Sequence, residues 1–284
     1  MVSFENLILK LQQFWQKNAN CAILPSCDQE VGAATLNPFT AFRVLDDNPL
    51  SFSQIQFCRR PADARFAENS NRLSGYYQLQ VIIKPSLQNI QKLCLDSFRE
   101  IGIDTDMHDF RFVEDNWSNP SIGATGVGYE VWCDNMEILQ FTYMEQVCGI
   151  KCKLNPVELT YGLERVAMYV QGVDSIFDIK YNDSGARYSD FHQVRNEIEY
   201  SKYYKDCDFD KNDLFERFDK FVKTSKNLIN EKLPLISYEY AVKASQVLNI
   251  IDARGYISQN DRASKLLIIR DSVCEAAALW LNVK

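Results

Sequence analysis

One stretch of this sequence, from Gln56 to Lys84, constrains the fold more than any other. A β-type run, Ser53–Cys58, leads to the adjacent arginines Arg59 and Arg60, and a polar loop follows before a second alternating run, Tyr76–Ile83. The stretch holds five Arg or Lys and two Asp or Glu, in a chain whose net charge is −7. Guanidinium groups bind phosphate oxygens through paired hydrogen bonds and stay charged at any working pH. The pattern therefore predicts two strands joined by a loop that can hold a polyphosphate. On composition alone, a surface hairpin with solvated charges is the alternative.

A second, shorter stretch, Val157–Gly172, has the pattern of a strand followed directly by a helix. The strand is expected at Glu158–Tyr161 and the helix at Leu163–Val170, with Gly172 as the stop signal. Arg165 falls in the first turn of this helix, so its side chain is expected to point across the sheet to which the strand belongs. On pattern alone, a structural Glu–Arg pair is the alternative.

Strand-like runs dominate from Cys21 to Tyr161, separated by hairpin signals and one helix. The sequence contains neither G-x-G-x-x-G nor a P-loop, so a bound nucleotide would be held by side chains on a sheet. This organisation predicts an α+β fold with an antiparallel β-sheet flanked by helices. Helical periodicity predicts helices at residues 4–15, 87–101, 214–228, 240–251 and 266–280, of which the last three form a small C-terminal helical domain.

The clearest turn signal is Asp134-Asn135, between two alternating runs. A regular two-residue hairpin places Glu130 and Glu137 on one face of the sheet and Gln140 and Thr142 on the other, whereas a one-residue bulge would exchange these sets. Two carboxylates near a triphosphate suit Mg²⁺, which binds one or two carboxylates together with phosphate oxygens. Glu130 and Glu137 are therefore candidate metal ligands, and solvated or ion-paired strand carboxylates are the alternative.

Charge, cysteines and histidines argue against several function classes. A pI near 5.1 does not suit a protein that wraps nucleic acid unaided. The nine cysteines are scattered without a C-x-x-C pair, which predicts reduced thiols and no zinc site. The two histidines, His108 and His192, are expected to be structural. No apolar run approaches the roughly 18 residues of a membrane span, and no signal-peptide pattern opens the chain, so we expect a cytoplasmic protein without membrane or DNA partners.

These stretches resemble the signature motifs of the class II aminoacyl-tRNA synthetases. Motif 2 is matched by Arg59-Arg60 with Arg72, Tyr76 and Gln80, the end of motif 3 by Gly162-Leu163-Glu164-Arg165, and motif 1, more loosely, by Val31–Pro38. Longer runs, including HDFRFVEDNWSNPSIGATGVGYEVW and ELTYGLERVAMYVQGVDSIFD, resemble the α subunit of the bacterial heterotetrameric glycyl-tRNA synthetases over nearly the whole chain. The resemblance implies a catalytic domain at residues 1–172, with motifs near 31–45, 56–84 and 157–172, and a helical domain at 173–284.

The resemblance also implies a function and its partners. The chain would be a glycine–tRNA ligase subunit that activates glycine with ATP and Mg²⁺ and transfers glycine to its tRNA together with a β subunit, as an α–α homodimer within an α2β2 heterotetramer. For ATP it implies Arg60 or its neighbour Arg59 at the α-phosphate, Arg165 at the γ-phosphate and Tyr76 against adenine, with Arg72 and Glu68 as further contacts. The glutamate usually found two residues after the motif 2 arginine is absent, and Asp63 or Glu68 is the candidate substitute.

One departure from the motif 3 pattern bears on the substrate. Glu158 and Thr160 stand where many class II synthetases carry glycines, on the same strand face as Gly162. Their side chains would fill the amino-acid pocket, so that only a substrate without a side chain fits, and Glu158 would pair with its ammonium group. Gln78, Gln80 and Trp117 are expected to complete the pocket. The alternatives are a synthetase-like binding or regulatory subunit without activity and a related ligase that forms an amide.

Overall fold

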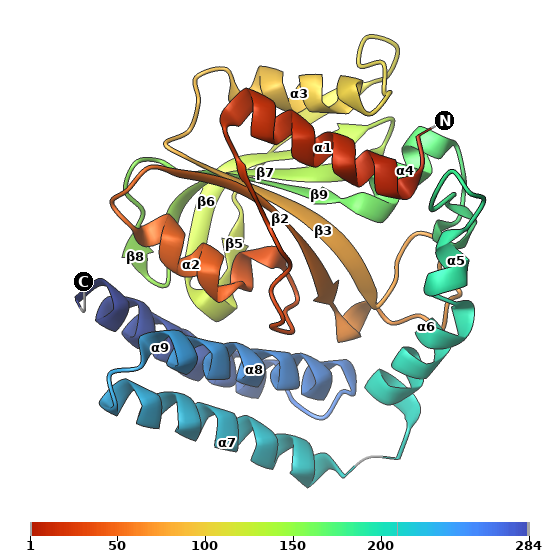
Figure 1. Ribbon diagram of the computed structural model, residues 1–284. Helices are drawn as coiled ribbons and strands as arrows, with labels where there is room; N and C mark the ends of the chain where they lie inside the picture. Colours follow the sequence, from red (N-terminus) through yellow and green to blue (C-terminus); the bar gives the residue numbers. More distant parts are fainter. Residues whose placement is uncertain (1, 209, 283–284) are drawn as a thin grey trace.

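The computed structural model describes residues 2–208 and 210–282, which form one large sheet with helices on both faces (Figure 1). The strands are β1 Ala22–Leu24, β2 Leu50–Arg59, β3 Gly75–Lys84, β4 Phe110–Asp115, β5 Ser118–Asn119, β6 Ala124–Cys133, β7 Met136–Val147, β8 Ile150–Lys151 and β9 Val157–Gly162. Their order in the sheet is β1-β2-β3-β9-β7-β6-β4, with β5 paired to β6 and β8 to β7. The pairings between these strands are antiparallel except that of β1 with β2, which is parallel.

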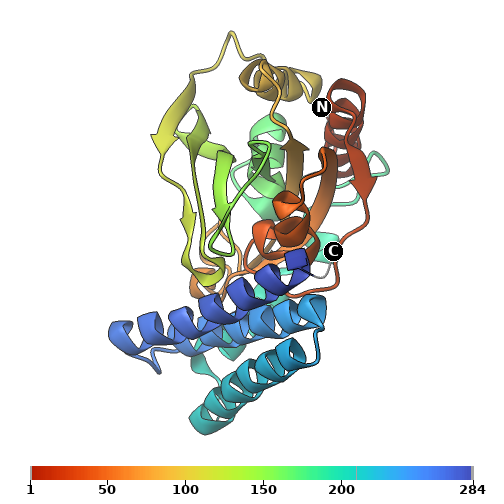
Figure 2. The same ribbon diagram turned by 90° about the vertical axis from the view of Figure 1, so that its left-hand side faces the viewer.

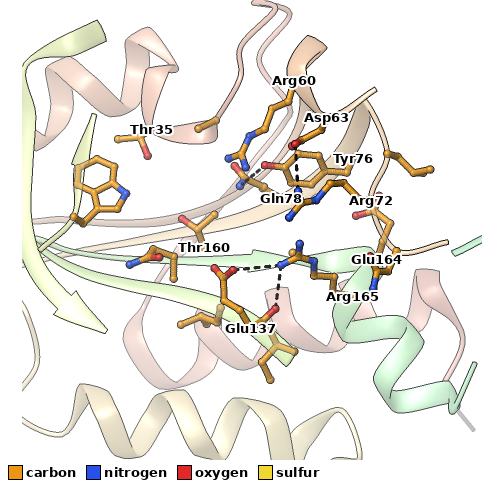
Figure 3. Close-up of a pocket in the computed structure, with 18 of the residues that line it drawn as sticks. Thr35, Arg60, Asp63, Arg72, Tyr76, Gln78, Glu137, Thr160, Glu164 and Arg165 are labelled. Atoms are coloured by element: carbon orange, nitrogen blue, oxygen red, sulfur yellow. Dashed lines mark hydrogen bonds and ion pairs between the residues drawn. The ribbon is translucent and has the colours of Figure 1, made fainter. Parts of the chain in front are cut away.

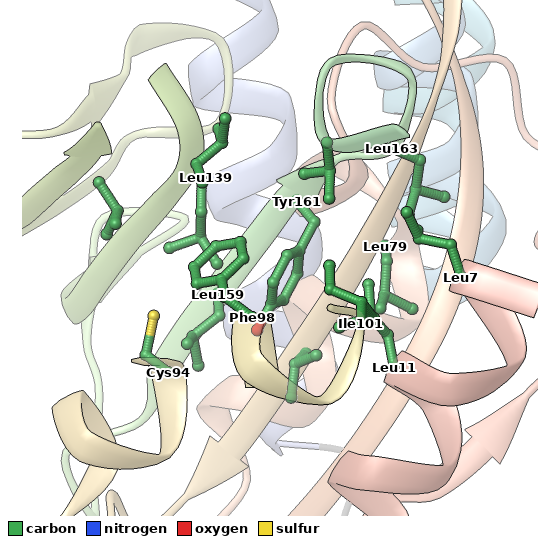
Figure 4. Packing of buried hydrophobic residues seen from close by; sticks show 14 of the residues in the cluster. Leu7, Leu11, Leu79, Cys94, Phe98, Ile101, Leu139, Leu159, Tyr161 and Leu163 are labelled. Carbon is green, nitrogen blue, oxygen red and sulfur yellow. The ribbon is translucent and has the colours of Figure 1, made fainter. Parts of the chain in front are cut away.

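One face of the sheet is apolar and is covered by α1 (Phe4–Ala19), α3 (Ile90–Glu100) and α4 (Leu163–Gln171). Alternate residues of the central strands, such as Leu79 and Leu159, pack there against the buried stripes of these helices (Figure 4). Tyr161 is fully buried in this layer, and its hydroxyl bonds to Trp15 Nε1 at 3.1 Å and Ser97 Oγ at 2.7 Å. The three helices packed on this apolar face thus hold the central strands in place.

The opposite face of the central strands is polar. The strand register sets Gln54 beside Gln80, Gln80 beside Thr160, and Thr160 beside Gln140. Because side chains alternate between the two faces of a sheet, these polar side chains form one continuous surface. Part of it is covered by the short turn η1 (Ala34–Leu36) and by α2 (Pro38–Leu45), and the rest lies open.

Three long helices, α7 (Lys211–Asn230), α8 (Pro234–Ala253) and α9 (Gln259–Asn282), pack together beside α2 and one end of the sheet (Figures 1 and 2). Phe42 of α2 lies between Tyr238 and Trp280, with ring centroids 5.1 Å and 4.9 Å away. The shorter α5 (Tyr188–Phe191), α6 (Val194–Ser201) and the π-helical turn η5 (Lys202–Asp206) connect α4 to these helices. The predicted α+β fold and the C-terminal helices are therefore confirmed. The division into domains at residue 172 stays a prediction.

The structure decides between the two alternatives left open for one hairpin and corrects the start of one helix. The β6–β7 hairpin contains a bulge: Trp132 pairs with Glu137 but Val131 with Leu139, so Ile138 is the extra residue. Gln140 and Thr142 therefore lie on the polar face with Glu130, not on the apolar one. The helix predicted from residue 87 begins at Ile90 instead.

Candidate active site

A cavity of about 400 Å³ opens on the polar face of the sheet (Figure 3). Its lining comes mainly from the η1 turn, the loop between β2 and β3, the start of β3, the β5 and β7 region, and the β9–α4 junction. Those used below are Thr35, Arg60, Asp63, Arg72, Tyr76, Gln78, Trp117, Glu137, Gln140, Glu158, Thr160, Glu164 and Arg165.

Arg60 faces this cavity, whereas its neighbour Arg59 does not. The Arg60 Nε donates to Gly32 O at 2.8 Å, and the guanidinium carbon lies 5.1 Å from the centre of the Tyr76 ring. Arg59 ends β2 and lies instead over the Tyr200 ring, 5.1 Å from its centre, in a separate hollow with Glu30. Consecutive residues at a strand end point to opposite sides, which accounts for the difference. Of the two arginines, only Arg60 is placed to meet a ligand in the cavity.

Two further arginines bring positive charge to the cavity, each with a carboxylate partner. Arg72 Nη1 lies 3.9 Å from Asp63 Oδ1, and Arg165 Nη1 lies 3.3 Å from Glu137 Oε2. About half of the Arg72 side chain is exposed, so the ion pair holds it only weakly. Arg165 lies in the first turn of α4, and its side chain lines the cavity and points toward Glu137 (Figure 3).

The floor of the cavity contains a buried carboxylate, Glu158, which is 2% exposed. Thr35 Oγ1 donates to its two oxygens at 2.8 and 3.1 Å, and Gln80 Nε2 donates to the first of them. Burial raises the pKa of Glu158, and the hydrogen bonds from Gln80 and Thr35 lower it in part. Buried charge is costly unless it is paired, and none of the contacts described here brings a cation to Glu158.

A chain of amides fixes this floor. Gln80 is fully buried and accepts hydrogen bonds from Thr40 Oγ1 at 2.8 Å and Gln54 Nε2 at 2.6 Å. Gln78 accepts from the Ala34 backbone N–H at 2.9 Å and donates to the Tyr76 hydroxyl at 3.1 Å. Because each amide is held at both ends, its oxygen and nitrogen are assigned by the network, and the floor is preorganised.

A second buried carboxylate, Glu164, lies at the cavity wall. Its Oε1 accepts from the Tyr77 backbone N–H at 2.8 Å and from the Tyr188 hydroxyl at 2.9 Å, while its Oε2 is buried and accepts no hydrogen bond from another described residue. Burial raises the pKa of Glu164 to about 7, against the lowering effect of these hydrogen bonds. Glu164 therefore ties α4 to the β3 strand beside Tyr76.

A family model described as glycyl-tRNA synthetase alpha subunit matches residues 4–284. The chain belongs to the glycyl-tRNA synthetase alpha subunit family. Among solved structures it is similar to pyrrolysyl-tRNA synthetase from Desulfitobacterium hafniense, with 15% identity over 66% of this chain and 77% of that chain and a TM-score of 0.44. It is also similar to PylSc, a pyrrolysyl-tRNA synthetase of the same organism, with 15% identity over 66% and 74% of the two chains and a TM-score of 0.43.

Membership of the glycyl-tRNA synthetase alpha subunit family makes this protein an aminoacyl-tRNA ligase with the class II synthetase fold. Most of the residues expected to bind ATP or glycine line the one cavity: Arg60, Arg72, Tyr76, Arg165, Gln78, Trp117, Glu158 and Thr160. The cavity therefore brings together the three sequence motifs that the family resemblance predicted.

Four predicted site residues of this family member do not line the cavity. Arg59 points away from it, and Glu68 lies exposed in the β2–β3 loop. Gln80 lies behind Glu158 and can act on a ligand only through that carboxylate. Glu130 is on the correct face, but its Oε2 accepts a hydrogen bond from Trp132 Nε1 at 2.9 Å, outside the cavity lining. We therefore leave these four out of the ligand-contacting set.

Thr35 and Glu164 are among the lining residues that the sequence analysis did not assign to the site. Thr35 lies in the stretch that resembles motif 1, and its contact with Glu158 spans 123 residues, so no local pattern shows it. Glu164 belongs to the G-x-E-R pattern, but a carboxylate next to an arginine in the sequence predicts an ion pair between the two side chains. It does not predict a buried carboxylate in the wall of a cavity.

Of the two predicted metal ligands, only Glu137 lines the cavity, where its carboxylate lies beside Arg165. Mg²⁺ needs few protein carboxylates when phosphate oxygens supply the other ligands, so one accessible glutamate fits the ion.

A separate group, His108, Cys133 and Asp134, lies outside the cavity. The Tyr169 hydroxyl bonds to both His108 and Asp134, which gives the group a structural explanation. None of the described helices is long and apolar enough to cross a membrane.

Proposed function

We propose that this chain is the catalytic α subunit of a glycine–tRNA ligase, which forms glycyl-adenylate from glycine and ATP and charges the tRNA together with a β subunit. The observation that carries the proposal is a buried carboxylate, Glu158, at the floor of a cavity whose rim holds Arg60, Arg72 and Arg165. A small zwitterion fits the floor, and a polyphosphate fits the rim.

The floor supports glycine as the amino acid. Thr160 and Glu158 project into the volume that a substrate side chain would take, and Gln78 and Trp117 line the same region. The glycine ammonium group would supply a cation to Glu158, which forms no ion pair with any residue that the structure describes. A filled pocket rejects larger substrates by steric overlap, which is more effective than the roughly 1–3 kcal/mol by which a pocket rejects a substrate that is one methylene too small. No smaller amino acid competes with glycine.

The rim supports ATP. In this proposal Arg60 holds the α-phosphate, Arg165 the γ-phosphate and Tyr76 the adenine, and Arg72 is a further contact. A glycine carboxylate oxygen then attacks the α-phosphorus in line, a new P–O bond forms, and pyrophosphate leaves. The 3′ hydroxyl of the tRNA next attacks the glycyl carbonyl and AMP leaves. The arginines contribute by position and by stabilising the charge on phosphate oxygens.

Glu137 is the residue that we assign to Mg²⁺. The ion, when bound with ATP, neutralises phosphate charge. Glu137 and Arg165 are adjacent, so one can meet the cation while the other meets a phosphate oxygen.

The family and the charge of the chain support the assembly that we propose. An acidic protein with pI near 5.1 needs a partner to hold most of a tRNA. We assign that role to a β subunit, and we expect an α–α dimer within an α2β2 heterotetramer that works in the cytoplasm.

The decisive experiment is amino-acid-dependent ATP–pyrophosphate exchange with each of the twenty amino acids, with and without the β subunit. Exchange with glycine alone is expected. Exchange that needs the β subunit would mean that the site is completed across the subunit interface. If no amino acid supports exchange in either sample, the chain is instead a synthetase-like regulatory subunit.

A further inference from the structure

The loop that joins β2 to β3, residues 60–74, carries Arg60 and Arg72 and is hydrogen-bonded to a distant segment, residues 176–205. Four contacts connect them. Ile176 N donates to Ser70 O at 2.9 Å, and Phe66 N donates to Ser201 Oγ at 2.8 Å. Lys205 Nζ donates to Ala64 O, and Ser74 N donates to Glu197 Oε2 at 2.9 Å. Figure 1 shows α5 and α6 running beside this loop at the edge of the molecule.

Glu197 contributes a buried carboxylate to these contacts, at 1% exposure. Its second oxygen, Oε1, lies 2.7 Å from His192 Nε2, which follows α5. Both oxygens of the carboxylate are therefore engaged, one with the loop and one with the imidazole. An acceptor buried in this way is costly to leave without its donors, so the arrangement is strongly specified.

The contact reaches Arg60 through a single residue, Ser74. Ser74 donates its N–H to Glu197, and its carbonyl accepts the Arg60 N–H at 2.7 Å. A shift of Ser74 therefore moves the backbone of Arg60, whose guanidinium faces the cavity. Glu164 acts in parallel three residues further on, because it accepts the Tyr77 N–H and is held by Tyr188 of α5. Two buried carboxylates thus fix the backbone on either side of Tyr76.

We propose that Glu197, oriented by His192, is a positioning residue that places Arg60 for ATP binding, an inference that rests on the proposed function. Glu197 itself touches no substrate. Its effect is to keep the loop in the binding geometry before ATP arrives. A displacement of a phosphate-binding group by about 1 Å can cost on the order of a hundredfold in rate, so the contact bears on the ATP site and leaves the glycine floor unaffected.

The test combines one measurement that needs activity with one that does not. In Glu197→Ala the KM for ATP in pyrophosphate exchange is expected to rise by about ten- to a hundredfold, while the KM for glycine stays within about twofold. Hydrogen–deuterium exchange of residues 60–74 in the ligand-free protein is expected to increase. Ser225→Ala is the matched control, because Ser225 is as buried and hydrogen-bonded to Ser237, away from the cavity.

A conservative variant separates positioning from bulk stability. Glu197→Gln keeps an acceptor for Ser74, and His192 can accept from the new amide in its other tautomer, so most of the ATP affinity is expected to return. If Glu197→Ala does not fold, Ser201→Ala replaces it, with a smaller rise in the KM for ATP and in loop exchange.

Unchanged loop exchange together with an unchanged KM for ATP would overturn the inference, as would equal losses for ATP and glycine. If the wild-type protein shows no pyrophosphate exchange at all, the proposed function fails, and hydrogen–deuterium exchange still decides whether Glu197 holds the loop.

Discussion

At the scale of single residues, Glu158 is the group on which glycine recognition depends in the proposed mechanism. Its carboxylate is buried and accepts hydrogen bonds from the neutral side chains of Thr35 and Gln80. Glu158→Gln keeps the volume and removes the charge. A hydrogen bond to a charged group contributes about 1.5–3 kcal/mol, so the KM for glycine is expected to rise roughly ten- to a hundredfold. The KM for ATP, measured in the same exchange assay, should stay constant; unchanged glycine kinetics would contradict the role.

A change at Thr160 tests whether steric overlap excludes amino acids larger than glycine. Thr160→Gly opens space beside Glu158 on the cavity floor. Glycine affinity is expected to fall, and alanine is expected to become a substrate, because one methyl group corresponds to about 1–3 kcal/mol of discrimination. Pyrophosphate exchange with glycine, alanine and serine measures the change. A variant that still excludes alanine would show that another group closes the pocket.

Glu164 gives a prediction on pH. In the unfolded chain its carboxyl has an ordinary pKa of 4.5, and burial raises the folded-state pKa to about 7. The folded state binds this proton more tightly, so the contribution of Glu164 to stability is complete below pH 4.5 and is lost as the pH rises through 7. The difference corresponds to roughly 3 kcal/mol at most.

Urea unfolding of wild type and Glu164→Gln at pH 5 and pH 8 measures this effect. The variant is expected to lose less free energy of unfolding between the two pH values than wild type. Glu216→Gln, on an exposed side chain of α7, is the control and should follow wild type. Parallel pH dependence in wild type and Glu164→Gln would show that the proton is not bound at Glu164.

At the scale of elements, the β6–β7 hairpin depends on its turn. Asp134 and Asn135 both have positive φ, of 44° and 76°. Asp134 also accepts the Asp109 N–H at 2.8 Å and bonds to His108 and Tyr169. Asp134→Ala is therefore expected to lower the free energy of unfolding by about 2 kcal/mol. Asn135→Gly, which suits positive φ, should be neutral or slightly stabilising. Equal effects of the two changes on urea unfolding would contradict this account.

Most helices and strands were predictable, because each depends on the spacing of apolar residues or on turn residues within a short stretch of sequence. The stripe of α1, with Leu7, Leu11 and Trp15 buried, follows from its helical spacing, and the hairpin turn follows from Asp134-Asn135. The bulge at Ile138 was not predictable, since an alternating run carries no mark of one extra residue.

The residues of the candidate site also differ in how far the sequence predicts them. Arg60, Tyr76 and Arg165 belong to recognisable motifs, whereas the contact of Ser74 with Glu197 joins residues 123 positions apart. The choice between Arg59 and Arg60 depends on where β2 ends, which no sequence period defines to one residue. Contacts between distant segments therefore had to come from the structure.

At the scale of the whole molecule, the C-terminal helices are joined to the sheet that carries the site. Tyr238 donates to Leu36 O at 3.2 Å, next to Thr35, and Gln246 Nε2 donates to Arg59 O at 2.9 Å, next to Arg60. The apolar cluster that contains Phe42 and Phe52 also contains buried residues of α7, α8 and α9. These helices thus support both the cavity floor and the β2 strand end.

It follows that the site-bearing sheet should depend on the C-terminal helices for its stability. A chain ending at residue 206 would expose the apolar surface around Phe42, and such surface contributes about 25 cal/mol per Å² when buried. We expect the full chain to unfold in one calorimetric transition, and the shortened chain to show none and to bind a hydrophobic dye. If the shortened chain unfolds cooperatively near the wild-type temperature, the sheet is an independent domain, and the contacts of Tyr238 and Gln246 join two units that are each stable alone.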